Sequence, residues 1–126
     1  MTKVVVAADG KWIRDQVRTA LTSSNTEVFE VTRGQDVRIA VAEHAPDVVV
    51  LDMQIANMGG VAAAIDLHLE IDAGRVPDTR ILLLLDREAD KFLAKRAAAD
   101  AELVKPLDAG TLRRTMKRLL AADAPV

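Results

Sequence analysis

The sequence predicts an α/β domain in which a five-stranded parallel sheet has helices on both faces. Two observations lead to this prediction. Short aliphatic runs alternate with longer amphipathic stretches along the 126 residues, which is the pattern of strands joined by crossover helices. The clearest aliphatic runs are continuous rather than alternating with polar residues, as expected for strands that are buried on both faces.

Composition narrows the possibilities further. The length fits one domain with its own core, and with one Trp, two Phe and no Tyr that core must be aliphatic. Cysteine is absent, which excludes disulfides, thiolate zinc sites and thiol nucleophiles. The net charge of −2 gives no general attraction to nucleic acid. The first apolar run is too short for a signal peptide or a membrane span, so we expect a soluble, cytoplasmic domain that does not enter a membrane.

Each element has its own signal. The predicted strands are short runs rich in Val, Ile and Leu, and the more polar run 26–31 is expected nearer the sheet edge. The predicted helices place apolar side chains three and four residues apart, and we expect Ile65, Leu69 and the Ala cluster at 62–64 to face the core. Pro46 ends the second helix, and Asp108 is a candidate N-cap for the last. In chain order the predictions are strand 3–8, helix 11–22, strand 26–31, helix 34–43, strand 48–51, helix 61–71, strand 81–85, helix 90–99, strand 102–104 and helix 108–121.

Charged residues directly follow three of these strands. Right-handed crossovers make a flavodoxin-like strand order, 2-1-3-4-5, the expected topology. In that order Asp9, Asp52 and Lys105 meet at the carboxyl edge of the sheet, where open α/β sheets place their chemistry. Two acids and a lysine suggest a divalent cation, a phosphorylatable Asp and a charge-sensing Lys. The alternatives are a surface charge or helix cap for Asp52 and a strand-ending turn for Lys105 with Pro106.

At these residues the chain resembles the receiver domain of two-component response regulators. The resemblance extends from residue 3 to about residue 120 and preserves the order and strand context of each motif. The matching segments are Pro-Asp-Val-Val-Val-Leu-Asp-Met at 46–53, Met-Gly-Gly at 58–60, Leu-Val-Lys-Pro-Leu-Asp at 103–108, and Asp9 with Arg14.

The resemblance implies a role for each site residue. Asp52 would accept a phosphoryl group from a sensor histidine kinase or a phosphotransfer protein. Asp9, Asp52 and the backbone carbonyl of Gln54 would hold Mg²⁺, and Lys105 would pair with the phosphoryl oxygens. The domain would pass the change to a downstream protein or an attached output domain, and a homodimer through the fourth and fifth helices is plausible. No enzyme activity is expected beyond self-catalysed phosphoryl transfer and autodephosphorylation.

The sequence departs from the family pattern at four positions. Receivers usually carry two adjacent acids after the first strand, and here the first is Ala8. The Ser or Thr at the end of strand four aligns with Leu85, the proline after the phosphoacceptor with Ala56, and the switch aromatic with Glu102. Asp86 is interpreted as a solvated acid at a helix start; inside the pocket it would oppose phosphorylation.

These departures support a second hypothesis, a pseudo-receiver that acts as a phosphorylation-independent interaction module. A small flavodoxin-like enzyme or cofactor binder is a third possibility, and no Gly-rich phosphate loop or nucleophile–base pair supports it. We expect residues 1–122 to form the receiver domain and residues 123–126 to be a tail or the start of a linker.

Several residues outside the predicted site have structural roles or roles that the sequence leaves open. Trp12 is expected to be a half-buried packing aromatic rather than a contact for partners. His44 and His68 are expected to be structural or exposed. Four basic residues of the last helix form either a solvated face or a surface for a partner or dimer, without direct nucleic-acid binding. They are Arg113, Arg114, Lys117 and Arg118.

Overall fold

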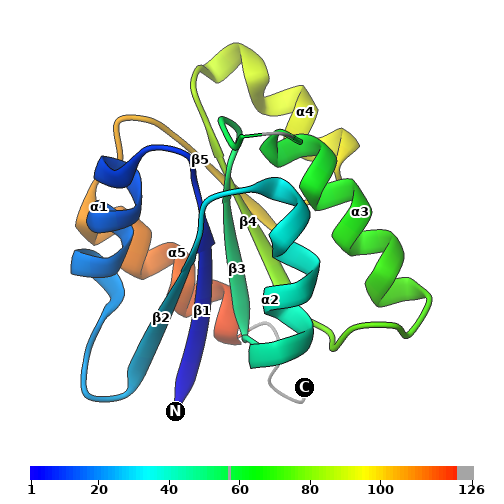
Figure 1. The fold of residues 1–126 in the computed structure, drawn as a ribbon. Helices are drawn as coiled ribbons and strands as arrows, with labels where there is room; N and C mark the ends of the chain where they lie inside the picture. The colour runs from blue at the N-terminus through cyan, green and yellow to red at the C-terminus, as the bar shows by residue number, and fades with distance from the viewer. Residues whose placement is uncertain (57, 122–126) are drawn as a thin grey trace.

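A five-stranded parallel sheet lies at the centre of the domain, and its order β2-β1-β3-β4-β5 is the predicted one (Figure 1). The computed structural model describes residues 1–56 and 58–121. The strands are β1 (Thr2–Ala7), β2 (Thr26–Val31), β3 (Val48–Asp52), β4 (Arg80–Leu85) and β5 (Ala101–Val104). The polar strand β2 lies at one edge, as its composition predicts.

The five predicted helices are all present. Short 3₁₀ turns, η1 (Gly34–Asp36) and η2 (Glu88–Asp90), precede the second and fourth, and the fourth ends earlier than predicted. At the start of the last helix, Asp108 accepts the backbone N–H of Thr111 at 2.9 Å, which confirms the predicted N-cap. The helices are α1 (Lys11–Leu21), α2 (Val37–His44), α3 (Gly60–Asp72), α4 (Lys91–Arg96) and α5 (Ala109–Ala121).

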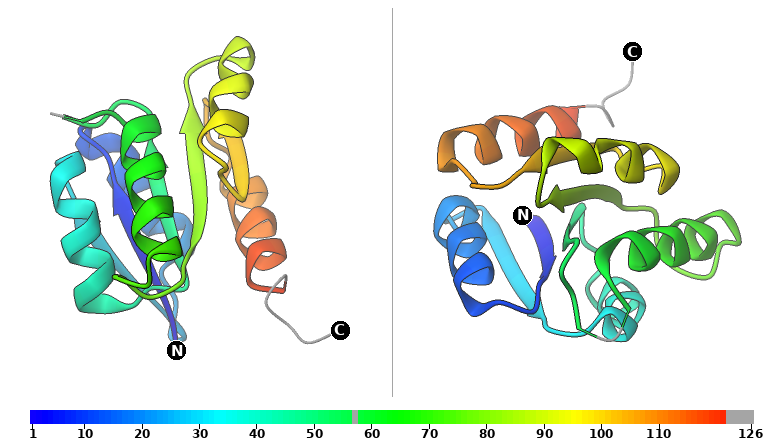
Figure 2. Two further views of the ribbon diagram at one scale, coloured as in Figure 1. Left: turned by 90° about the vertical axis from the view of Figure 1, so that its right-hand side faces the viewer. Right: turned by 90° about the horizontal axis from the view of Figure 1, so that it is seen from above.

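The sheet separates two aliphatic cores. Helices α2, α3 and α4 cover one face, and α1 and α5 cover the other (Figure 2). Successive side chains of a strand point to opposite faces, so Leu83 and Leu85 enter the first core while Leu82 and Leu84 enter the second. Burial on both faces explains why the central strands are continuous aliphatic runs.

The prediction for the inward face of α3 is confirmed for Ala63 and Ala64, which are buried, and wrong for the two larger aliphatic side chains. Ile65 is 42% exposed and Leu69 is 60% exposed, whereas Leu67 is fully buried. The helix begins at Gly60, where any side chain would overlap the backbone carbonyl of Asp52. This close approach fixes the rotation of the helix, so small residues and Leu67 face the sheet while the two larger aliphatic side chains face outward.

The parallel register aligns the carboxyl ends of the strands at one edge of the sheet. Asp52 pairs with Leu84, and Leu85 pairs with Val104, the residue before Lys105. Within the described residues, no helix is long and apolar enough to cross a membrane. The expected tail, 123–126, lies outside those residues.

Candidate functional site

Asp52 is the last residue of β3, and its carboxylate is almost fully buried at 2% exposure. Its Oδ1 atom accepts two hydrogen bonds, from the backbone N–H of Gln54 at 3.2 Å and from Nζ of Lys105 at 2.5 Å. Within residues 1–56 and 58–121 no hydrogen bond ends on Oδ2. The carboxylate is therefore fixed through one oxygen, and the other has no protein donor among these residues.

Lys105 directly follows β5 and reaches across the end of β4. Its backbone N–H donates to the Leu85 carbonyl at 2.9 Å, and its side chain is only 13% exposed. Nζ donates to Asp52 and also to Oδ1 of Asp86 at 2.8 Å. Burial lowers the pKa of Lys105, but the hydrogen bonds and charges of the two carboxylates outweigh it and raise that pKa above its ordinary value. The side chain is therefore an ammonium ion at neutral pH.

Asp86 is part of this site, so its interpretation as a solvated helix-start acid is wrong. Leu85 is fully buried in the core, and the chain turns just after it, which points the next side chain at Lys105. The other carboxylate oxygen of Asp86 accepts Nε2 of Gln54 at 2.7 Å. Hydrogen bonds from Lys105 and then Gln54 lower the pKa of Asp86. One feature of the sequence indicates this role, an acid directly after a central strand.

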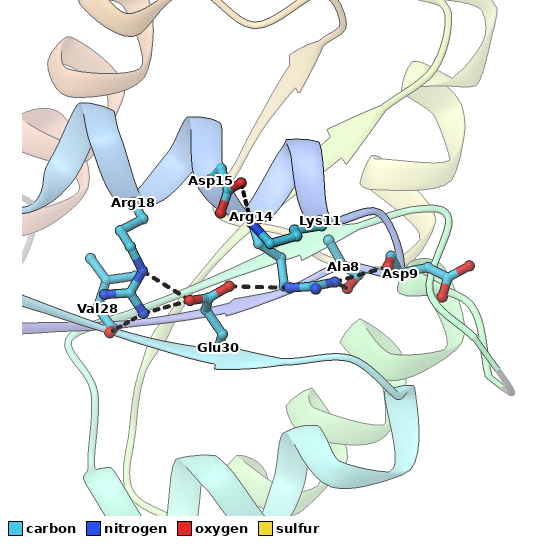
Figure 3. A network of polar contacts seen from close by, with 8 residues as sticks. All are labelled: Ala8, Asp9, Lys11, Arg14, Asp15, Arg18, Val28 and Glu30. Carbon is cyan, nitrogen blue, oxygen red and sulfur yellow. Dashed lines mark hydrogen bonds and ion pairs between the residues drawn. The ribbon is translucent and has the colours of Figure 1, made fainter.

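Asp9 lies in the loop after β1, and its carboxylate is exposed. Its backbone N–H donates to the Gln54 carbonyl at 3.3 Å, which joins the loops after β1 and β3. Among the described residues no hydrogen bond or ion pair ends on the Asp9 carboxylate, which points away from Arg14 (Figure 3). Ala8, in place of a second acid, is fully buried.

Arg14 holds this loop in place. Its Nη1 donates to the carbonyls of Ala8 and Asp9, both at 2.8 Å, and its Nε donates to Glu30 of β2 at 3.1 Å. Arg18, one helical turn further along α1, binds the other oxygen of Glu30 at 2.9 Å (Figure 3). Glu30 therefore ties α1 to the edge strand and leaves the Asp9 side chain unconstrained. The resemblance included Asp9 with Arg14 as a matching motif, but the backbone contacts of Arg14 and the part played by Glu30 were not predicted.

The oxygen atoms at this edge fit a hydrated divalent cation. No three His, Cys, Asp or Glu side chains gather into a metal cluster in the part of the chain that the structure describes. Mg²⁺ keeps several waters and needs only one or two carboxylates with a carbonyl. The unpaired Asp9 carboxylate, Oδ2 of Asp52 and the Gln54 carbonyl are such a donor set, on loops already joined by a hydrogen bond.

Other candidate residues lie away from this edge. His44 stacks on Phe29 with ring centroids 3.8 Å apart, and Nε2 of His68 lies 3.5 Å from Oδ2 of Asp72. Trp12 is 64% exposed, so its prediction as a half-buried aromatic is wrong. Glu102, in the position of the switch aromatic, lies partly buried in β5.

Two of the basic residues of α5 make different contacts. Arg113 donates to the Ala20 carbonyl at 3.3 Å and lines, with Lys117, a hollow of about 540 Å³ between α1 and α5. Arg114 instead donates to the Thr111 hydroxyl at 3.0 Å. The helix therefore uses part of its basic face for packing against α1.

The strand order, with Asp52 and Lys105 at the carboxyl edge, places the chain among the doubly wound α/β domains that build their site at this edge. The family model of the response regulator receiver domain matches residues 4–117. The chain therefore belongs to the response regulator receiver domain family. Domains of this family serve in two-component signalling as modules rather than as enzymes; they interact with histidine kinases and output domains and generally bind Mg²⁺.

Individual relatives agree with this assignment. The KDP operon transcriptional regulatory protein KdpE of Escherichia coli is 33% identical over 129 residues, covering 99% of this chain and 56% of KdpE. Protein PilH of Pseudomonas aeruginosa is 26% identical over 121 residues, covering 96% of this chain and 99% of PilH. The solved structure of chemotaxis protein CheY4 from Vibrio cholerae matches with a TM-score of 0.82 at 26% identity, covering 95% of this chain and 99% of CheY4. The chain thus spans about half the length of KdpE and nearly all of PilH.

Proposed function

We propose that this domain is a phosphorylation-dependent signalling switch in which Asp52 accepts a phosphoryl group from a histidine kinase or a phosphotransfer protein. The observation that supports this most strongly is the buried Asp52 carboxylate, fixed through Oδ1 by Lys105 and Gln54. A nucleophile held in one orientation loses little freedom on the way to an in-line transfer. The proposal extends to residues 1–122 as the receiver domain.

In the transfer, an Asp52 carboxylate oxygen forms a bond to phosphorus while the bond from phosphorus to the donor breaks. The leaving group departs with the electron pair of that bond. Mg²⁺, bound by Asp9, Asp52 and the Gln54 carbonyl, would supply neutralisation of charge between the anionic donor and acceptor. Lys105 places its ammonium beside the acceptor, where a phosphoryl oxygen arrives, and offsets the added negative charge. Ala8 leaves the cation one acid fewer, and such a loss lowers metal affinity by about 10–100-fold.

The readout would pass to a downstream protein or an attached output domain. Phosphoaspartate brings a charge of about −1.5 to −2, which biases a two-state loop or helix near the site. Because Glu102 stands in place of the switch aromatic, we propose that this domain does not use an aromatic side chain of β5 for that readout. A homodimer through α4 and α5 remains part of the proposal for the partner.

A pseudo-receiver is the second candidate function, and two observations favour it. Lys105 donates to the Asp86 carboxylate at 2.8 Å, so its ammonium has an anionic partner besides Asp52. Ala8 removes an acid from the metal site. A domain in this arrangement would present the same surface to a partner whether or not a phosphodonor is present.

Phosphoryl labelling decides between the two functions. The purified protein is incubated with Mg²⁺ and excess acetyl phosphate, and its intact mass is measured over time. We expect one phosphoryl adduct in the wild type, none in Asp52→Asn, and the wild-type result in Asp47→Asn. Asp47 is a matched control because it lies next to the other end of β3 and accepts the Lys3 backbone N–H at 2.9 Å. No adduct at saturating metal and donor would contradict the switch and support the pseudo-receiver.

A further inference from the structure

The ammonium of Lys105 has two carboxylate partners, and only one of them is the proposed phosphoacceptor. Nζ lies 2.5 Å from Oδ1 of Asp52 and 2.8 Å from Oδ1 of Asp86. Two carboxylates and one ammonium leave a net negative charge at the place where an anionic phosphodonor must arrive. Asp86 therefore changes the electrostatics of the site without supplying the nucleophile.

Asp86 is held there from two sides. Gln54, from the loop after β3, donates Nε2 to its second oxygen at 2.7 Å, so both oxygens of the carboxylate have a donor. The side chain is still 32% exposed, and among the described residues these two side-chain donors are its links to the site. Such an anion can leave toward solvent without opening the core.

The backbone around Asp86 joins a rigid element to a short one. On one side is β4, whose last residue, Leu85, is fully buried. On the other side is η2, where the Asp90 carboxylate accepts two hydrogen bonds from Arg87. One comes from the Arg87 backbone N–H at 3.1 Å and the other from Nη2 of the Arg87 side chain at 3.2 Å. The turn and α4 are therefore capped as a unit that begins directly after Asp86, and a displacement of Asp86 would be transmitted to that unit.

We propose that Asp86 is a tethered anion that occupies Lys105 in the resting domain and is expelled when Asp52 is phosphorylated, so that residues 86–96 move outward. This inference rests on the proposed phosphorylation of Asp52 and names how that site is regulated and read out. The phosphoryl group would accept the hydrogen bond of Lys105 in place of Asp86. Repulsion between the phosphoryl group and the Asp86 carboxylate would then push Asp86 away and break its hydrogen bond with Gln54. The resting ion pair also slows phosphorylation, because the incoming donor meets an anion at the entrance.

Two variants separate this role of Asp86 from a general charge effect. Asp86→Asn keeps the shape and removes the charge, and Asp86→Ser supplies a small hydroxyl in case the amide disturbs the loop. Glu88→Gln is the control, because it removes one charge from the same segment at a side chain that is 76% exposed and forms an ion pair with Lys91. Thermal unfolding and circular dichroism of each variant check that it folds.

The first readout is the initial rate of adduct formation with acetyl phosphate and Mg²⁺, followed by intact mass. Removing a like charge from the entrance should raise the rate on the order of tenfold in Asp86→Asn and Asp86→Ser, and Glu88→Gln should match the wild type. An unlabelled wild type beside labelled Asp86 variants would contradict both the proposed switch and the expulsion, because Asp52 of the wild type would then not be phosphorylated. Equal rates in all four proteins would overturn it while the proposed function stands, and no adduct in any of them would overturn both.

The second readout is amide hydrogen exchange across residues 86–96 with acetyl phosphate kept in excess. In the wild type, exchange in this segment should accelerate on phosphorylation, and in Asp86→Asn the change should be smaller because a neutral side chain is not expelled. A phosphorylated wild type with unchanged exchange in this segment would contradict the displacement.

Discussion

At the scale of single residues, the pKa values of Asp86 and Lys105 connect the site to the stability of the fold. Hydrogen bonds from Lys105 and then Gln54 place the pKa of Asp86 below its usual value of about 3.9. Its charge therefore stabilises the fold above that value, and the contribution is lost as the pH falls through the depressed folded pKa. The pKa of Lys105 is raised, so its contribution is complete below about pH 10.4 and is lost as the pH rises through the folded pKa.

The acid side of this linkage gives a direct prediction. The difference in the free energy of unfolding between the wild type and Asp86→Asn should be constant from about pH 5 to 9, where both groups keep their charges. Below about pH 4 this difference should become smaller. Asp86 of the wild type is then protonated and, like the asparagine of the variant, carries no charge. Urea unfolding at a series of pH values measures this difference, with Glu88→Gln as the control. A difference that stays constant down to pH 2 would contradict the linkage.

The sequence predicted the residues at the sheet edge better than the contacts between them. Asp9, Asp52 and Lys105 follow strands whose order follows from crossover handedness, so their common edge was predictable. Asp86 follows a strand in the same way, yet its direction depends on the turn after Leu85 and on the reach of Gln54 across the loop. These are properties of side-chain geometry, and sequence spacing does not determine them.

At the scale of elements, the start of α3 sets the position of the phosphoacceptor. The backbone of Gly60 packs against the carbonyl of Asp52, and the Gly60 N–H donates to the Met53 carbonyl at 3.1 Å. The aliphatic pattern of α3 predicts that Ile65 and Leu69 face inward, but both are exposed. The phase of the helix is fixed instead by the smallest residue, because only a glycine permits this close approach.

We therefore expect Gly60→Ala to destabilise the domain and to impair Asp52 together. A methyl group there overlaps backbone that cannot move aside cheaply, which typically costs about 1–3 kcal/mol in a packed site. Urea unfolding measures the loss, and acetyl phosphate labelling measures the effect on Asp52.

Gly110→Ala is the matched control for that prediction. The added methyl group in α5 would lie 3.3 Å from the side chains of Arg114 and Asp108, which can adjust. Its unfolding free energy should stay within about 1 kcal/mol of the wild type, in line with helix propensity. Equal effects of the two substitutions would show that the close approach to Asp52 is unimportant.

At the scale of the whole molecule, stability comes from two aliphatic cores with the sheet between them. The fold class, the strand order and all five helices were predictable, because burial on both faces makes each central strand a continuous apolar run. Helix ends and inward faces were less predictable. The 3₁₀ turns before α2 and α4 and the rotation of α3 depend on packing that no local pattern in the sequence records.

A pair of leucines in α3 tests this arrangement. Leu67 is fully buried in the core beneath α2 and α3, and Leu69 is 60% exposed. Leu67→Ala should lower the free energy of unfolding by about 2–5 kcal/mol through lost burial and a cavity. Leu69→Ala should change it by no more than about 0.5 kcal/mol. Chemical denaturation of both variants checks the rotation of the helix, and a larger loss for Leu69→Ala would contradict it.

The exposed indole of Trp12 gives this domain an intrinsic fluorescence signal close to its own site. It is the one Trp in a chain without Tyr, so emission excited at the red edge of protein absorption comes from this side chain alone. Its ring lies over Gly10, the neighbour of Asp9, with Nε1 about 2.9 Å from where a Gly10 side chain would begin. Charge that accumulates beside Asp9 therefore acts on the single fluorophore of the molecule, and titrations of metal or phosphodonor can be followed without an attached label.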